Sequence, residues 1–174
     1  MLSIYRTWCV ILLAGCRIPL IVRIKVFISL GAAAALRQSV AMTLDLCPCG
    51  RSDAKGRPLA RSRCCGPCLD DFAAHPAVDA ESLMRSRYSA FVEGQADYLL
   101  ATWHASQRPA TIDFEPGCKW LGLEIRCARS TGPEAAEVEF VARSRIAGRA
   151  QRLHERSRFV RQDGRWYYLD GDLL

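Results

Sequence analysis

Residues 119–127 read KWLGLEIRC, a stretch in which apolar and polar side chains alternate. Leu121, Leu123 and Ile125 fall on one side of an extended chain, and the same alternation returns in residues 138–143, which read VEFVAR. A period of two is typical of a strand that buries one face. The sequence therefore predicts two half-buried strands here.

The strand pattern continues to the C-terminus. Residues 150–161 place Leu153, Glu155, Ser157 and Phe159 on one face of a third strand. Asp163-Gly164 follows, a dipeptide that favours a tight hairpin turn, and it leads into the aromatic run Trp166 to Leu169. We expect an antiparallel meander.

Two helices are predicted upstream of the strands. Asp79 is an N-cap candidate, and apolar residues at helical spacing follow it until Gly94 ends the segment. A second short helix, Gln95 to His104, places apolar side chains along one side. A helical hairpin followed by a meander is an α+β arrangement, in which we expect a curved antiparallel sheet to wrap the helices and leave a cone-shaped pocket.

Four cysteines form two close pairs ahead of these helices. The pairs are Cys47 with Cys49 and Cys64 with Cys65. Clustering of this kind favours a metal site over disulfides, and two short-range pairs supply the four thiolates of a tetrahedral zinc site. The opposing interpretation is a set of free, buried cysteines in a reducing cytoplasm. We favour Zn²⁺, because residues 42–68 offer few apolar side chains with which to fold otherwise.

The other five cysteines have weaker claims. Cys68 either substitutes for one of the four ligands or has no metal role. We expect no metal role for the remaining cysteines, and Cys127 falls on the apolar face of its predicted strand. These are Cys9, Cys16, Cys118 and Cys127.

The cysteine segment resembles a known module. Cys47-Pro48-Cys49-Gly50, a basic loop and Cys64-Cys65-Gly66 are similar to the SEC-C motif, a small zinc-binding module named for the C-terminus of the SecA translocation ATPase. The loop, residues 50–63, is longer than is typical of that motif. Residues 80–91, 98–104 and 154–171 are similar to the YchJ-like family. The resemblance covers about residues 46–171 and implies an NTF2-like domain behind a zinc knuckle, without implying a particular activity.

These observations divide the chain into three parts. Residues 1–41 are an extension that we do not expect to belong to the folded protein, residues 42–68 are the SEC-C-like zinc knuckle, and residues 78–174 are the NTF2-like domain. The extension has no acidic residue, and its two apolar runs fall short of the ~18 residues of a membrane-spanning helix. We expect no membrane span and a cytoplasmic location.

The extension has three interpretations. Leu13-Ala14-Gly15-Cys16 matches the lipobox of bacterial lipoproteins, whereas the acid-free, arginine-containing composition resembles an organellar presequence. The third interpretation is that Met42 is the real start, and we favour it because the composition changes abruptly there.

Charge locates a candidate partner surface. Five of the 24 basic residues lie in the extension, which leaves 19 against 18 acidic residues, so the body is not a broadly basic nucleic-acid binder. Positive charge is concentrated only between the cysteine pairs. The SEC-C module of SecA contacts proteins and ribosomes, so this resemblance suggests that the loop binds a protein partner, ribosomal or translocation-associated. RNA is a less favoured partner, and the alternative is a solvated loop that binds nothing. We also expect a homodimer through the open face of the sheet. The candidate partner-binding residues are Arg51, Lys55, Arg57, Arg61 and Arg63.

The cone supplies the competing hypothesis. NTF2-like folds include isomerases and dehydratases as well as noncatalytic binding modules, so the fold alone does not decide. We favour a noncatalytic interaction or ligand-binding module and assign no catalytic residue. The alternative function is a small-molecule isomerase or lyase that uses His104, Asp113 or Glu155 in the cone. Glu155 faces solvent or is buried against Arg85 or Arg87. The candidate pocket residues are Arg85, Tyr88, Trp103, His104, Trp120, Glu155 and Trp166.

Overall fold

The structure is a computed structural model, and it describes residues 45–174. The N-terminal extension, its lipobox-like stretch ending at Cys16, and Met42 lie outside the described residues, so the expectations about them stay predictions. Within residues 45–174, no helix combines the length and the apolar composition that crossing a lipid bilayer requires.

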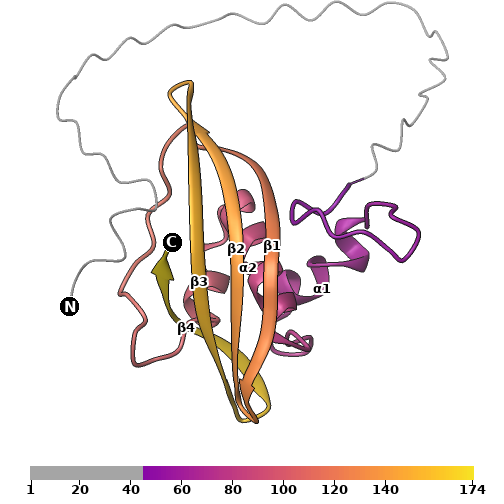
Figure 1. Cartoon of the computed structure of the whole chain (residues 1–174), viewed down its shortest axis with the longest axis vertical. Coiled ribbons are helices and arrows are strands. Elements are labelled where there is room, and N and C mark those ends of the chain that lie inside the picture. Colours follow the sequence, from indigo (N-terminus) through magenta and orange to yellow (C-terminus); the bar gives the residue numbers. More distant parts are fainter. Residues whose placement is uncertain (1–44) are drawn as a thin grey trace, which may run out of the picture.

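In residues 45–174, four helical segments precede a four-stranded antiparallel sheet with the strand order β1-β2-β3-β4. In Figure 1 the sheet lies in front of the helices, and the cysteine knuckle lies to one side of them. This arrangement confirms the predicted α+β meander. The segments are η1 (Arg61–Arg63), α1 (Gly66–Asp70), α2 (Ala80–Glu93), α3 (Ala96–Ala101), β1 (Lys119–Gly132), β2 (Ala135–Ile146), β3 (Arg149–Gln162) and β4 (Arg165–Leu173).

The ends of α2 are set by the residues that the sequence singled out. The Asp79 carboxylate accepts a hydrogen bond of 2.6 Å from the backbone N–H of Ser82, which satisfies one of the free amides of the first turn. Gly94 ends the helix in the left-handed conformation, with a φ of 70°. The expected N-cap and helix end are both confirmed.

The second helix is shorter than predicted. α3 stops at Ala101 instead of reaching His104. The backbone beyond it pairs with β4: Tyr168 donates its N–H to the carbonyl of Thr102, and His104 donates its N–H to the carbonyl of Tyr168. These hydrogen bonds to a distant strand replace the last turn of the expected helix, which sequence spacing alone does not reveal.

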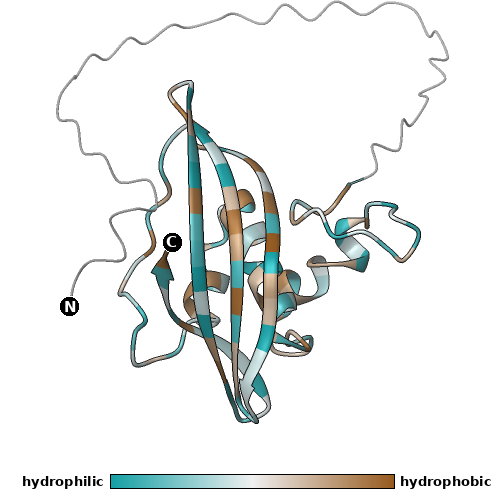
Figure 2. Ribbon diagram, in the orientation of Figure 1, coloured by the Kyte–Doolittle hydropathy of each residue, from teal (hydrophilic) through white to brown (hydrophobic). Residues whose placement is uncertain are grey.

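The alternation in β2 and β3 is confirmed, and Figure 2 shows hydrophobic and hydrophilic bands following one another along the strands. Val138 and Phe140 are fully buried on the inner face of β2, and Phe159 is 1% exposed on β3. The hairpin between β3 and β4 turns at Asp163-Gly164, where both residues have positive φ as a two-residue turn of this kind requires.

The alternation predicted for β1 is only partly right. Its pairing with β2 is irregular between Trp120 and Gly122 and again between Ile125 and Cys127. Each irregularity reverses the side on which the following side chains lie. As a result Leu121 is exposed while Trp120 packs on the core, and Cys127 is exposed rather than on the apolar face.

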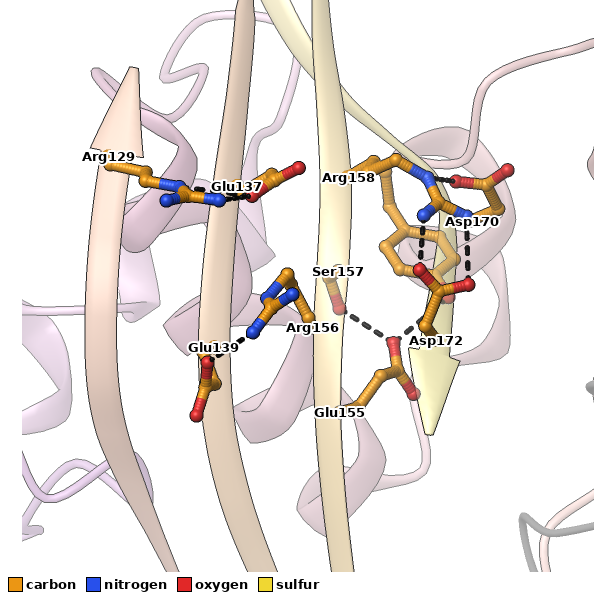
Figure 3. Close-up of polar contacts among 10 residues, drawn as sticks. Arg129, Glu137, Glu139, Glu155, Arg156, Ser157, Arg158, Asp170 and Asp172 are labelled. Atoms are coloured by element: carbon orange, nitrogen blue, oxygen red, sulfur yellow. Dashed lines mark hydrogen bonds and ion pairs between the residues drawn. The ribbon is translucent and has the colours of Figure 1, made fainter. Parts of the chain in front are cut away.

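The two faces of the sheet differ in chemistry. The inner face packs against α2, whereas the outer face carries ion pairs between neighbouring strands (Figure 3). The bridges include Arg129 to Glu137 between β1 and β2 and Arg156 to Glu139 between β2 and β3, at 2.6 and 3.1 Å. Arg158 pairs with Asp172 across β3 and β4 at 2.6 Å. The expected homodimer through this face stays a prediction.

Candidate functional site

Four thiols converge at the junction between the knuckle and α2. The sulfur atoms of Cys47, Cys49, Cys64 and Cys65 all lie within 4.8 Å of one another, and three of these residues are buried. The Sγ atoms of Cys49 and Cys64 are 3.5 Å apart, and those of Cys64 and Cys65 are 3.9 Å apart. Cys68 is not a member of this cluster but packs half-buried on α1.

These distances fit a metal centre and not disulfides. A disulfide joins its sulfurs at about 2 Å, and all four cysteines are free. A tetrahedral ion with metal–sulfur bonds of about 2.3 Å holds its ligand sulfurs about 3.8 Å apart. The four thiols can therefore bind a metal ion without a large rearrangement.

The protonation equilibria of the cluster fit the same conclusion. Hydrogen bonds from Cys49 and Cys65 lower the pKa of the Cys47 thiol well below its ordinary value. Burial and negative charge on Cys49 raise the pKa of Cys64 to about 12, and the pKa of Cys65 is raised by its hydrogen bonds to Cys47 and Cys49. Four thiolates in this space need a cation among them, which a divalent metal supplies.

The long loop between the pairs folds as a small hairpin. The N–H of Cys47 donates to the carbonyl of Leu59 and the N–H of Leu59 donates to the carbonyl of Arg51, both at 2.9 Å. The chain leaves the first pair at Gly50, whose φ of 69° turns it sharply away from the sulfurs. The extra loop length is therefore accommodated beside the cluster, and the two pairs still meet.

The knuckle is attached to α2 through the thiol cluster itself. The Sγ of Cys47 lies 3.7 Å from the hydroxyl of Ser89, and Arg85 donates a hydrogen bond of 3.2 Å to the carbonyl of Cys49. Arg85 also bonds Glu81, one turn earlier, at 2.7 Å. This arginine was expected in the cone, and the structure places it at the knuckle instead.

Two of the five loop cations strengthen this attachment. Arg61 forms bidentate hydrogen bonds with both Glu93 and Asp70, at 2.8 to 3.0 Å. Arg51 reaches Glu81 at 3.4 Å. Both residues join the knuckle to the helical layer.

The other three cations of the loop lie away from α2. Arg57 pairs with Asp53 inside the hairpin at 2.8 Å. Lys55 and Arg63 are exposed and form no ion pair among the described residues. The partner surface predicted on this loop stays a prediction.

A cavity of about 180 Å³ lies inside the cone. Its walls come from α2, from the inner face of the sheet and from the connection between α3 and β1. Met84 and Phe91 of α2 and Phe140 of β2 make it largely apolar, and Ile112 and Thr111 of the connection line it as well. The cavity is thus assembled from three separate parts of the chain.

Glu155 is the buried polar centre of this cavity. Glu155 is only 1% exposed, and its Oε1 accepts a hydrogen bond of 2.6 Å from the hydroxyl of Ser157 (Figure 3). The hydroxyl of Tyr168 donates a second hydrogen bond to Oε1, at 3.1 Å. Oε2 is also buried, yet it has no hydrogen-bond partner among the described residues. A Cβ at Gly171 would lie 2.3 Å from Oε1, so the absent side chain at this position gives the carboxylate its place.

Burial raises the pKa of Glu155, while the hydrogen bonds of Ser157 and Tyr168 and the charge of Arg87 oppose that rise. Arg87 is 4% exposed and lines the same cavity. Its guanidinium donates to the carbonyl of Leu99 and lies 4.7 Å from the ring centre of Tyr168. The cone therefore contains a buried cation and a buried carboxyl group in an apolar setting.

Of the seven predicted pocket residues, the structure places only Trp103 and Glu155 on this cavity. Tyr88 and Trp120 pack edge to face in the core at 5.5 Å, and Trp166 packs half-buried against the core. The ring of His104 bonds Ser106 and Gln162 outside the cavity.

The predicted pocket set omitted five polar residues that line the cavity, although Arg87 had been named as a possible partner of Glu155. They are Arg87, Thr111, Asp113, Ser157 and Tyr168. The signal for Ser157 was present, since the alternation that turns Glu155 inward turns Ser157 inward as well. Asp113 was predicted from the sequence as an acid-base candidate. It lies in a loop, is exposed, and lines the cavity.

Comparison with known proteins gives one family. Residues 79–171 match the model described as YchJ, middle NTF2-like domain. A UPF0225 protein of Polaromonas sp. (strain JS666) is 68% identical over 127 residues, covering 72% of this chain and 91% of the relative. A UPF0225 protein of Bordetella pertussis is 53% identical over 130 residues, covering 73% and 92%.

Two solved structures are similar. The crystal structure of a SEC-C motif containing protein from Psychrobacter arcticus has a TM-score of 0.62 at 31% identity, covering 73% of this chain and 81% of that one. The solution structure of a SEC-C motif containing protein from Rhodopseudomonas palustris has a TM-score of 0.63 at 32% identity, covering 74% and 98%. With its four-cysteine cluster followed by an NTF2-like domain, the chain belongs to the YchJ-like UPF0225 family.

Proposed function

We propose that this protein is a noncatalytic small-molecule-binding protein, in which a structural Zn²⁺ in the knuckle supports α2 and the cone cavity holds the ligand. The observation that carries the proposal is Oε2 of Glu155, a buried polar atom without a hydrogen-bond partner among the described residues, on a residue that lines a largely apolar cavity. Leaving such an atom unpaired costs about 1–3 kcal/mol. A ligand that pairs with it recovers this free energy.

The zinc is supported by the donor set. Four thiolates at tetrahedral spacing are the ligands of structural zinc sites, in which no coordination position stays open for a substrate. Cys47, Cys49, Cys64 and Cys65 would hold the ion, and it would act as a cross-link between the two cysteine pairs of the knuckle. The bonds of Ser89 and Arg85 to the cysteines would then transmit this order to α2.

Elemental analysis tests the metal. We expect one zinc per chain in the purified protein and none after Cys64→Ser is combined with Cys65→Ser. Cys127→Ser is the matched control, since Cys127 is exposed and outside the cluster. Reduced protein that contains no metal, or a variant that keeps its zinc, would contradict the assignment.

The methyl group of Met84 can report on ligand binding in the cavity. Met84 lines the cavity, and the chain has only three methionines, so ¹³C-methyl labelling gives few signals and one of them reports on the cone. We expect single-ring compounds to shift this signal in a saturable way. Thr111→Trp should abolish the shift by filling the cavity from an exposed lining position, whereas Thr131→Trp, on an exposed part of β1, should leave it unchanged. A signal that no ring compound moves would contradict binding in the cone.

The alternative function, an isomerase or lyase, needs two titratable groups that converge on one substrate atom. Glu155 and Asp113 line the cavity, but His104 is engaged outside it. Tyr168 already donates its hydroxyl to Glu155. We favour binding because this network satisfies one carboxylate oxygen and leaves the other as a recognition atom.

A protein partner at the knuckle is a separate proposal. It rests on the exposed Lys55 and Arg63, together with Arg57 at the hairpin tip, because Arg51 and Arg61 are held against the helical layer. Replacing Lys55, Arg57 and Arg63 by glutamine should then remove a protein captured by the wild-type chain, without a change in the zinc content.

A further inference from the structure

The occupant of the cone can be narrowed by size, charge and hydrogen bonding, on the assumption that the proposed binding function holds. We propose that the cone binds a neutral molecule of about one six-membered ring that donates a hydrogen bond from an O–H or N–H group to Oε2 of Glu155. The proposal deepens the function above by naming the class of ligand. Each of its three parts comes from a different feature of the cavity.

Size follows from the volume. Apolar cavities of about 150 Å³ in other proteins accept benzene, and drug-sized ligands occupy about 300–1,000 Å³. The cone, at about 180 Å³, lies between these limits and close to the lower one. It therefore suits one ring with a small substituent, and not a polycyclic or nucleotide ligand.

Neutrality follows from the buried charges. Arg87 is stacked near the rings of Trp103 and Tyr168, with its guanidinium carbon 4.9 and 4.7 Å from the ring centres, and it bonds Thr102 at 2.7 Å. Its positive charge thus lies beside the cavity that Glu155 enters. A carboxylate at Glu155 balances that charge, so an added ionic ligand would leave one buried charge uncompensated.

The partners of the carboxylate decide which group donates the hydrogen bond between the ligand and Glu155. Ser157 and Tyr168 both donate to Oε1, which keeps that oxygen an acceptor and leaves Oε2 as the atom with unused lone pairs. Once ionised, Oε2 can only accept. The ligand must then supply the donor, which a phenol, a ring amide or an aromatic amine carries and a simple hydrocarbon lacks.

Phenol and toluene are the decisive probes, because they have the same number of heavy atoms and differ in one donor. Dissociation constants are measured with the full chain from the Met84 methyl signal, at slightly alkaline pH so that Glu155 is ionised despite its raised pKa. We expect phenol to bind about tenfold more tightly than toluene, the effect of one net hydrogen bond to a charged group. Benzaldehyde, which has only an acceptor, and the ions benzoate and benzylammonium should bind more weakly than phenol.

Glu155→Gln should reverse the preference of the cavity for a ligand that donates a hydrogen bond. The glutamine carbonyl keeps the bonds of Ser157 and Tyr168, so its NH₂ group takes the place of Oε2 and turns the acceptor into a donor. The variant should lose the preference for phenol and bind benzaldehyde more tightly than the wild type does. Glu139→Gln, on the outer face of β2, is the matched control and should leave every affinity unchanged.

The outcomes separate the two proposals. If toluene binds as tightly as phenol, or benzaldehyde more tightly, the ligand class is wrong while binding in the cone stands. If none of the probes moves the Met84 signal, both the ligand class and the binding function are overturned. The comparison of phenol with toluene uses the wild-type chain, so it decides the matter even if Glu155→Gln does not fold.

Discussion

At the scale of single residues, the buried Glu155 contributes to the pH dependence of stability. Burial raises its pKa in the folded state above the value of 4.5 that an exposed glutamate has, so the folded state holds the proton more tightly than the unfolded state. The resulting stabilisation is complete below pH 4.5 and is lost as pH rises through the folded-state pKa. Arg87 moderates the effect and the negative charge of Asp172 increases it.

Glu155→Gln should remove this dependence. Urea unfolding at a series of pH values should show that the variant gains stability relative to the wild type as pH rises, by about 1.4 kcal/mol for each pKa unit that burial adds. Glu139→Gln should behave in the opposite sense, because His154 and Arg156 lower the pKa of Glu139 and its stabilisation is lost as pH falls. Parallel curves for the wild type and Glu155→Gln would show that Glu155 does not titrate as a buried group.

Glu155 also shows what sequence reasoning can establish about a residue. Alternation placed it on a face with Leu153 and Phe159, but could not decide whether that face was buried. The same reasoning offered Arg85 and Arg87 as partners. Two positions apart on a helix, these side chains point to opposite sides, and only the packing of α2 shows that Arg87 lines the cone while Arg85 meets Cys49.

At the scale of elements, the docking of the knuckle on α2 depends on Arg61. Its bidentate bonds to Glu93 and Asp70 connect η1 with the end of α2 and with α1. Arg61→Gln keeps hydrogen-bonding capacity but loses both ion pairs. We expect a loss of about 1 kcal/mol, since single exposed pairs contribute less than bidentate pairs in a network. Thermal unfolding measures it as a fall of a few degrees in Tm.

Arg57→Gln is the matched control for this substitution. Arg57 belongs to the same loop but pairs only with Asp53, within the exposed hairpin. Its replacement should leave Tm unchanged and should not alter amide exchange in α2. Equal effects of the two substitutions would mean that loop charge, and not docking, accounts for the stability.

The elements were predictable where local rules govern them. Asp79 and Gly94 set the ends of α2, and Asp163-Gly164 set the last hairpin, because caps and tight turns depend on neighbouring residues. The predictions for α3 and β1 were partly wrong because pairing with another strand changes both segments. β4 captures the backbone after Thr102, and irregular pairing with β2 reverses the pattern in β1.

At the scale of the whole molecule, the cavity and the thiol cluster lie on different sides of one helix. Ser89 and Arg85 face the cysteines, while Met84, Arg87 and Phe91 face the cone. The four-cysteine cluster was predictable, because its ligands lie close together in sequence. The cavity was not, since its walls come from segments that the chain brings together only in the complete fold.

This shared helix predicts that metal and ligand binding are coupled. If the knuckle binds the zinc proposed above, removing it should free Cys47 and Cys49 from a fixed geometry, so the bonds that position Ser89 and Arg85 should weaken and α2 should gain freedom to move. A ligand in the cone must then restore the order of α2 when it binds, which reduces its affinity. We expect EDTA treatment to weaken phenol binding about fivefold, the lower end of typical coupling between two sites.

Titrations of the Met84 signal with phenol, before and after chelation, measure this coupling, and added zinc should restore the original affinity. Because coupling is reciprocal, saturating phenol should also slow the loss of zinc to the chelator. Cys49→Ser should reproduce the effect of EDTA, whereas Cys127→Ser should not, since Cys127 is exposed on β1 and outside the cluster. An affinity that chelation leaves unchanged would mean that α2 holds its place through the sheet alone, and that the knuckle serves a purpose independent of the cone.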